Sequence, residues 1–236
     1  MQLPRRAVLA ILACLIAASA GATSVHDYEK GEYLVIRHGL APNGQLSLAA
    51  HGDGENNDDA FHVWLMAEPK HRKLMALEGV SAENNLDTDP DSYHAFWSKD
   101  SRHVGLAFRS GRHEVTFNLY TIDGRQAHLL QGPDLFREVA GRDVGDDDGQ
   151  RLVNGMVEWG SGNRFTLKEF RSFVEADAGL AKLFGAYGRV TDKLDDGKLV
   201  TQFFVEAECE LLPNHRYRIV SRKPGSPGDA DTWWQR

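Results

Sequence analysis

The stretch "FWSKDSRHVGLAF", residues 96–108, has the pattern of two strands joined by a tight polar turn. The same order of residue types begins at Trp97, at Trp159 ("WGSGNRFTLK") and at Leu40 ("LAPNGQLSLA"). Each copy is followed by a second apolar run, which starts at Phe61, Val115 or Leu180. Repetition of one pattern along a chain is typical of repeated supersecondary units. The sequence therefore predicts three units of antiparallel strands.

The middle unit also predicts a register. If Ser110 and Gly111 form a two-residue hairpin turn, Val104 lies opposite Phe117 and Leu106 lies opposite Val115. A second turn at residues 123–124, Asp-Gly, starts another strand, "RQAHLLQ". In the first unit, Leu46, Leu48 and Ala50 share one face of a strand. Phe61, Val63 and Leu65 share another face, across the polar loop "GDGENNDD".

The pattern W-S-x-D-x-R-x-V-x-L, followed by a strand that ends in LY-x-x-D-G, resembles the repeats of TolB-like and WD40-like β-propellers. The resemblance covers about residues 34–192 and implies a mainly β fold of antiparallel blade-like meanders, as a small or partial β-propeller. The units are more widely spaced than ordinary blades of roughly 40–50 residues. A β-sandwich built from the same meanders is therefore the alternative.

One or two short helices are expected among the strands. Residues 166–188 show helical spacing as well as a strand pattern, so both states stay open for residues 166–176. The interpretation that fits both is a strand to about Phe173 and a helix from near Asp177 that stops at Gly185 or Gly188. Residues 133–142, which open with Pro133, predict a second helical turn.

The first 22 residues have the pattern of a signal peptide. Arg5 and Arg6 precede the short apolar run "AVLAILACLIAA" and a small-residue cleavage site. The run is too short for a membrane span. The domains are then residues 1–22, a single β-rich domain at 23–222 and a Pro/Gly-rich tail at 223–236. The predicted location is periplasmic or secreted, and a lipoprotein anchored through Cys14 is the alternative.

Charge and cysteine content narrow the classes of partner. Without Arg5 and Arg6 the chain has 25 basic and 34 acidic residues, a net charge of −9. A surface of this sign argues against nucleic acid and anionic membranes as partners. Cys209 is the one cysteine left after cleavage, so no internal disulfide is expected.

A polar loop offers candidate calcium ligands. Asp53, Glu55, Asn57 and Asp59 place side-chain oxygens at alternate positions, which suits a hard cation. The loop lacks the glycine and glutamate that an EF-hand requires, and a solvated hairpin tip explains the same residues. Calcium is therefore the alternative to a protein without a cofactor.

Five other residues are candidates for binding. Arg109 and Arg112 flank the predicted turn, where a pair of like charges would bind an anionic group of a partner. His113 lies opposite Phe108 in the predicted register. Trp233 and Trp234 are adjacent in the tail, where they either pack onto the fold or contact a partner.

The sequence contains no G-x-S-x-G, H-E-x-x-H or P-loop motif. The predicted function is an exported, non-catalytic protein that presents loops to a protein or other macromolecule of the cell envelope. The alternative is an envelope hydrolase or lyase with a site of histidines and carboxylates, with or without a metal. A third hypothesis is a structural module with an unpaired strand edge, which a partner completes. The oligomeric state is left open.

Overall fold

The computed structural model describes residues 23–52, 61–144 and 148–225. It holds 56% of residues in strands and 10% in helices, so the prediction of a mainly β fold with two short helices is confirmed. The helices are α2 (Leu135–Ala140) and α3 (Gly179–Phe184), and short 3₁₀ turns occur at Pro90–Ser92 and Gly185–Tyr187. The strands are β1 (Leu34–Leu40), β2 (Leu46–His51), β3 (His62–Ala67), β4 (Arg72–Ser81), β5 (His94–Trp97), β6 (His103–Gly111), β7 (Glu114–Asp123), β8 (Gln126–Leu129), β9 (Gln150–Trp159), β10 (Arg164–Glu175), β11 (Gly188–Lys193), β12 (Leu199–Leu212) and β13 (Arg216–Pro224).

The strands form one mixed sheet of 13 strands that does not close. Its order is β11-β12-β10-β9-β7-β6-β5-β1-β2-β3-β4, with β13 beside β12 and β8 beside β7. The pairs β1–β5 and β7–β9 are parallel and all other pairs are antiparallel. A propeller is not shown, and no propeller repeat is identified in the described residues.

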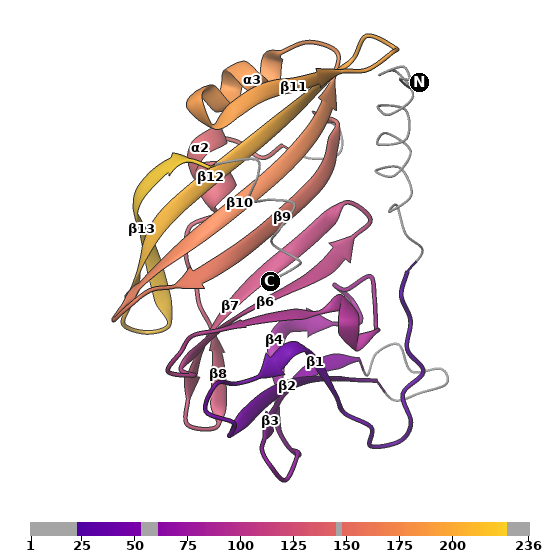
Figure 1. Cartoon of the computed structure of the whole chain (residues 1–236), viewed down its shortest axis with the longest axis vertical. Coiled ribbons are helices and arrows are strands. Elements are labelled where there is room, and N and C mark those ends of the chain that lie inside the picture. The colour runs from indigo at the N-terminus through magenta and orange to yellow at the C-terminus, as the bar shows by residue number, and fades with distance from the viewer. Residues whose placement is uncertain (1–22, 53–60, 145–147, 226–236) are drawn as a thin grey trace, which may run out of the picture.

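The first eight strands curl around one core because β1 changes direction in its middle. His38 has a φ of 54°, and the register with β2 shifts between Val35 and Leu40. Gly39 allows close approach at this bend, because a Cβ there would lie 2.5 Å from the Leu48 carbonyl oxygen. β1 can therefore pair with β2 on one side and with β5 on the other. As a result β4 and β8 come into contact without backbone pairing (Figure 1).

Side chains join β4 to the strands it meets. The Tyr120 hydroxyl on β7 donates to the Glu78 carbonyl oxygen over 2.6 Å. The Ala127 N–H on β8 donates to the Met75 sulfur over 3.2 Å. Inside the curl, the first core includes Leu48, Val104 and Leu106, each with no exposed surface. These contacts fix the space between β4 and β8.

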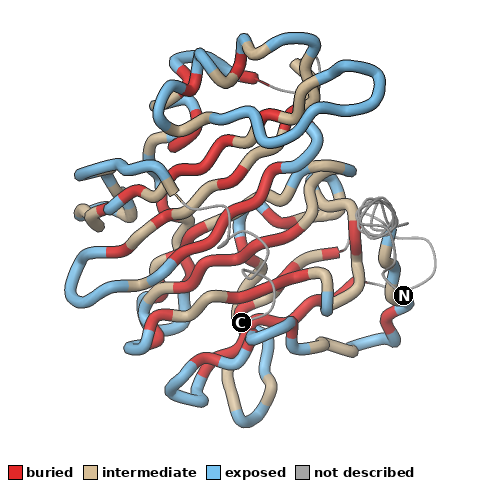
Figure 2. Tube along the Cα trace, turned by 45° about the horizontal axis from the view of Figure 1, so that its top comes forward, coloured by how far each residue is buried: buried red, intermediate tan, exposed pale blue. Residues whose placement is uncertain are grey.

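The long strands β9, β10 and β12 carry both helices on one face (Figure 1). Phe136 on α2 and Phe184 on α3 meet Phe173 and Phe203 of the sheet in a second core. Asp134 caps α2 by accepting the Arg137 N–H, and Gly141 ends it with a φ of 71°. Buried residues follow the central strands, whereas the region of α3 and β11 is largely exposed (Figure 2).

Most local predictions are confirmed. β2 and β3 pair as expected, with Leu48 opposite Leu65 and Ala50 opposite Val63. β10 continues as a strand to Glu175 before α3 begins at Gly179. β6, β7 and β8 form the predicted meander. β13 runs to Pro224, so a strand extends into the first residues of the predicted tail.

The predicted register of the β6–β7 hairpin is wrong. Val104 pairs with Tyr120 rather than Phe117, and the turn consists of Arg112 and His113 rather than Ser110 and Gly111. A shift of three residues exchanges the two faces of β7 relative to β6. The sheet tolerates this because both faces of the pair are covered: Val104 belongs to the first core and Leu119 to the second. Alternation therefore could not select one register.

Candidate functional site

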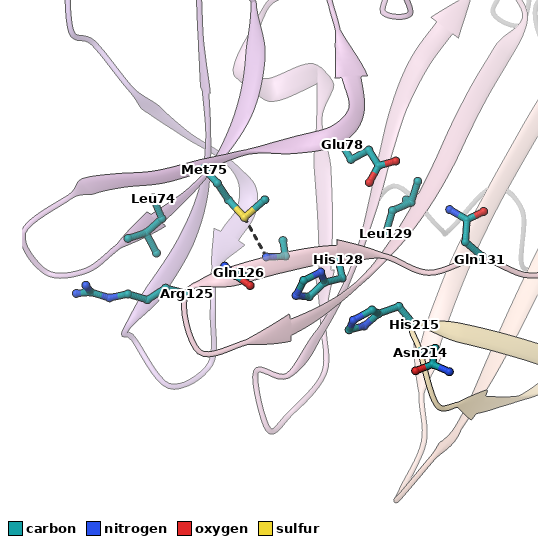
Figure 3. Close-up of a pocket in the computed structure, with 11 residues that line it drawn as sticks. Leu74, Met75, Glu78, Arg125, Gln126, His128, Leu129, Gln131, Asn214 and His215 are labelled. Atoms are coloured by element: carbon teal, nitrogen blue, oxygen red, sulfur yellow. Dashed lines mark hydrogen bonds between the residues drawn. The ribbon is translucent and has the colours of Figure 1, made fainter.

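A cleft of about 760 Å³ opens where β4, β8 and the turn between β12 and β13 meet (Figure 3). Its lining residues are Leu74, Met75 and Glu78 of β4, residues 125–129 and Gln131 in and around β8, and Asn214 and His215 of the turn. The three segments are far apart in the sequence, so only the folded chain assembles the site. Its volume lies within the range of ordinary ligand sites.

The hairpin between β7 and β8 builds one wall of the cleft. Gly124, with a φ of 59°, lies in the two-residue turn that pairs Asp123 with Gln126. Alternation along β8 sends Ala127 and Leu129 to the first core, whereas Gln126 and His128 lie on the other face. The cleft therefore receives polar side chains from a strand that is anchored on its apolar side.

The turn between β12 and β13 builds the opposite wall. Asn214 and His215 both have a positive φ, at 61° and 55°. Two backbone bonds hold this strained turn: the Gln131 N–H donates to the His215 carbonyl oxygen over 2.8 Å, and the Tyr217 N–H donates to the Gln131 carbonyl oxygen over 2.9 Å. The Tyr217 ring lies against Gly132, where a Cβ would come within 2.1 Å of the ring. This wall is therefore preformed.

His128 and His215 stack at the centre of the cleft. Their ring centroids are 4.1 Å apart and their planes differ by 13° (Figure 3). Imidazole nitrogens bind a metal along the ring plane, and parallel stacked rings direct those nitrogens side by side rather than at one point. In the described ranges, no group of three or more histidine, cysteine, aspartate or glutamate residues could hold a metal ion. The stacked pair is suited to contact with a planar or polar group of a ligand.

The remaining side chains give the cleft mixed chemistry. Leu74 and Met75 add an apolar surface, and the flexible thioether of methionine adapts to different ligands. Arg125 and Glu78 are exposed, and neither makes an ion pair within the described part of the chain. Such a combination of apolar contact and uncommitted polar groups is typical of a binding site.

The structure separates the predicted basic pair. Arg109 lies opposite Val115 on β7 and makes an ion pair with Asp87 at 3.4 Å. Arg112 and His113 form the turn of the hairpin, where Arg112 is exposed and His113 is half-buried, and His113 does not lie opposite Phe108. The prediction that the two arginines sit side by side is therefore wrong, because the register differs. None of the three lines the cleft of Figure 3.

Other predicted site residues cannot be placed. Asp53, Glu55, Asn57 and Asp59, the candidate calcium ligands, lie outside the described residues. Trp233 and Trp234 lie outside them as well, and so do residues 1–22, which include Cys14. Cys209 is fully buried in the second core, and burial raises the pKa of its thiol to about 12. This thiol is held in its neutral form.

A second polar cluster joins β2, the β3–β4 turn and the chain before β1. The Glu68 carboxylate accepts from the Ser47 hydroxyl over 2.6 Å and from His71 Nδ1 over 2.7 Å. His71 Nε2 lies 2.7 Å from the Tyr33 carbonyl oxygen. Both ring nitrogens therefore face acceptors, which only the imidazolium form satisfies. In a serine hydrolase the histidine lies between the serine and the acid. Here Glu68 lies between Ser47 and His71, so these three residues have a structural role and are called the lock.

Because the lock needs a charged His71 and a charged Glu68, the folded protein is expected to gain most stability from it at an intermediate pH. Burial alone would lower the pKa of His71, but its bonds to Glu68 and to the Tyr33 carbonyl raise that pKa above 6.5. Burial alone would raise the pKa of Glu68, but its bonds from Ser47 and His71 lower that pKa below 4.5. Because the pKa of His71 is raised in the folded protein, its contribution to stability is complete below pH 6.5. That contribution is lost as the pH rises through the raised pKa of His71. Because the pKa of Glu68 is lowered, its contribution to stability is complete above pH 4.5. That contribution is lost as the pH falls through the lowered pKa of Glu68.

Melting temperatures of the wild type and the His71→Ala variant between pH 4 and 8 test this lock. The difference between the two proteins should be largest near pH 5.5 and should shrink toward both ends of the range. His113→Ala, in the β6–β7 turn and outside this cluster, is the control and should follow the wild type. A difference between wild type and His71→Ala that is the same at every pH would contradict an ionised lock.

Ser98, Asp100 and His103 form a third cluster, which is also structural. The Ser98 hydroxyl donates to Asp100 over 2.6 Å and accepts the backbone N–H of His103 over 2.9 Å. The His103 ring instead stacks on Trp159. Burial lowers the pKa of His103, and it outweighs the opposite effect of the nearby Asp100 carboxylate. The serine is therefore used to close a turn rather than to reach a histidine base.

A buried histidine lies where β1 meets β5. His94 Nε2 and His38 Nδ1 are 2.7 Å apart, and the His94 ring stacks on Phe96. Burial, together with the nearby His38 and Arg37, lowers the pKa of His94 to about 4. His94 is therefore neutral at physiological pH, and it contacts His38 across the bend of β1.

Comparison with protein-family models, curated proteins and solved structures gives no match to this chain. In the described residues, no helix has both the length and the apolar character needed to cross a bilayer. The site is therefore interpreted from its own geometry.

Sequence reasoning missed the residues of the cleft. His128 and His215 are separated by 87 positions, and neither lies in a recognisable motif. The Asp-Gly turn at 123–124 marks the start of β8, but nothing local shows that β4 lies beside it. Pairing of the Asn214–His215 turn with Gln131 is a long-range contact of the same kind. The signal for this site exists only in the tertiary structure.

Proposed function

We propose that this protein is an exported, non-catalytic binding protein that holds a partner of the cell envelope in the cleft between β4, β8 and the β12–β13 turn. The observation that carries the proposal is the preformed cleft itself, which brings the His128–His215 stack together with Arg125 and Glu78. These polar groups need no rearrangement before they meet a partner, which lowers the cost of binding.

The chemistry of the other clusters favours binding over hydrolysis. The serine of each cluster bonds directly to a carboxylate, through Ser47–Glu68 and Ser98–Asp100. A hydrolytic relay would instead require contact between serine and a histidine ring. The cleft contains histidines, but they stack on each other and leave polar edges for a ligand.

Export belongs to the same proposal. The signal pattern of residues 1–22 supports passage to the periplasm or the exterior. N-terminal sequencing of the secreted protein would test export, with a new terminus expected after Ala20 or Ala22.

Site-specific photo-crosslinking in the native host tests the proposed cleft. A benzoylphenylalanine at Gln126, an exposed residue that lines the cleft, should give one discrete light-dependent adduct. The same probe at Leu183, an exposed residue of α3, is the matched control and should give none. Arg125→Glu should reduce the adduct at Gln126 because it reverses the charge at the mouth of the cleft.

Adducts of equal yield at Gln126 and Leu183 would mean that the cleft has no special affinity. Absence of an adduct at Gln126 in protein that is exported and folded would reject the cleft as the binding site. Adducts at Gln126 that persist in the Arg125→Glu variant would remove Arg125 from the site but would keep the cleft.

A further inference from the structure

We infer that the partner enters the cleft as an extended polypeptide segment and adds as a new strand to the free edge of β8. The inference rests on the proposed function and specifies the kind of partner and the mode of binding. The third hypothesis from the sequence, a partner that completes the sheet, describes the same behaviour.

The free edge of β8 follows from its register. Asp123 pairs with Gln126 across a two-residue turn, so Gln126 and, two residues later, His128 direct their backbone groups toward β7. Ala127 and Leu129 therefore direct their N–H and C=O groups away from β7. β8 pairs with no other strand in the described residues. This edge presents the row of backbone groups that an added strand requires.

Within the described residues, one bond from that row is observed, and its acceptor is weak. The Ala127 N–H donates to the Met75 sulfur over 3.2 Å (Figure 3). A thioether sulfur accepts weakly compared with a carbonyl oxygen, and a methionine side chain changes conformation readily. Met75 is thus a replaceable partner that protects the edge. The carbonyl of an incoming strand would form the stronger bond at the same N–H.

The space beside β8 is bordered by side chains rather than by a paired strand. β4 pairs with β3 alone and meets β8 without backbone hydrogen bonds. Met75 of β4 lies near Ala127, and Gly79 lies near Leu129, where a Cβ added to the glycine would be 3.9 Å from the leucine side chain. β4 and β8 already contact each other, so an added strand would have to take the place of the Met75 side chain and β4 would have to move away from β8 to admit it.

Charge at the two ends of the cleft defines the segment that fits. Arg125 precedes β8 at one end, and Glu78 lies beside Gly79 at the other end (Figure 3). Both are exposed and make no ion pair in the described part of the chain. A segment with an acidic residue toward Arg125 and a basic residue toward Glu78 is complementary to this arrangement. Alternate side chains of the segment would face the stacked histidines.

A displayed library of random twelve-residue peptides, selected against the mature protein, supplies the probe. Selected peptides are then synthesised with one N-methylated backbone amide at a time, and their affinities are measured by fluorescence anisotropy. Strand addition predicts that N-methylation weakens binding about tenfold at every second residue and has little effect between them, because only alternate amides face β8. The selected peptides should carry acidic and basic residues at opposite ends.

A pair of proline variants tests the edge from the side of the protein. Ala127→Pro removes the outward N–H without breaking the β7–β8 ladder, and it should weaken peptide binding about tenfold. Lys193→Pro is the matched control, because the Lys193 N–H on β11 bonds to the Asp192 side chain rather than to β12. This control should bind like the wild type. Hydrogen exchange of wild-type protein should show protection at Ala127 and Leu129 when peptide binds, whether or not the proline variant folds.

The possible results separate the inference from the proposed function. Peptides that crosslink to Gln126 but show no alternation on N-methylation, and no protection at Ala127 and Leu129, would overturn strand addition and leave the cleft as a binding site. No peptide binding, combined with no adduct at Gln126 in the host, would overturn both. If Ala127→Pro binds the peptides like the wild type and Lys193→Pro loses binding, the docking edge lies on β11 and the inference is overturned.

Discussion

Arg109→Ala is expected to lower the free energy of unfolding by about 3 kcal/mol, because it leaves a buried carboxylate without its cation. Asp87 has a side chain that is 2% exposed, and Arg109 Nη1 lies 3.4 Å from its Oδ2. The other carboxylate oxygen accepts the Ser24 N–H over 2.7 Å. A backbone donor alone cannot balance a buried negative charge. Urea denaturation followed by tryptophan fluorescence measures the loss.

Arg112→Ala is the matched control for this prediction. Arg112 lies in the exposed turn next to β6, so its removal should change stability by less than about 0.5 kcal/mol. Asp87→Asn combined with Arg109→Ala should recover part of the loss, because the amide carries no charge to be balanced. Equal stability of the two arginine variants would show that Arg109 is a surface group. The sequence-based hypothesis that it binds an anion would then regain support.

The sequence could predict those elements that local pattern determines. Alternation of Leu46, Leu48 and Ala50 gave both the strand and its buried face, and the Asp-Gly pair at 123–124 gave the turn before β8. Residues 133–142, opened by Pro133, marked the position of one helix, and Gly185 was one of the two glycines that marked the end of the other. In each case one or a few neighbouring residues carry the physical cause, whether burial of one face or the need for a positive φ.

The register of β6 and β7 shows where local pattern fails. Gly105 lies on the face of β6 opposite the first core, and a Cβ there would lie 2.7 Å from both Phe117 and Val157. This face is therefore packed as tightly as the face of Leu106, which belongs to the first core. With two buried faces, a shift by an odd number of residues keeps apolar groups inside on both sides. The register therefore depends on contacts with other strands, such as that between Gly105 and Val157 of β9.

The same reasoning explains why the cleft could not be predicted. Its walls depend on the bend of β1, which brings β4 to β8, and on the pairing of Gln131 with the β12–β13 turn. Both are contacts between distant segments whose residues have ordinary polar or turn-forming types. Composition nevertheless indicated a chain rich in histidine, and two of those histidines became the centre of the site.

Phe203→Ala is expected to have the largest effect on stability, a loss of about 3–5 kcal/mol. Phe203 has no exposed surface, and it contacts Phe136 of α2 and Phe184 of α3 with ring centroids 4.9 and 5.2 Å apart. Removal of this ring creates a cavity at the point where both helices meet the sheet, because two helices of six residues cannot move far enough to fill it. Urea denaturation measures the loss.

Two further variants identify the cause of this loss. Phe203→Leu keeps most of the volume and should cost less than about 1.5 kcal/mol. Leu183→Ala, on the exposed face of α3, should be nearly neutral, which separates packing from helix propensity. The cleft lies at the other core, so Phe203→Ala should still bind the selected peptides under conditions in which it is folded. Loss of peptide binding by folded Phe203→Ala protein would instead mean that the second core sets the geometry of the cleft through β12.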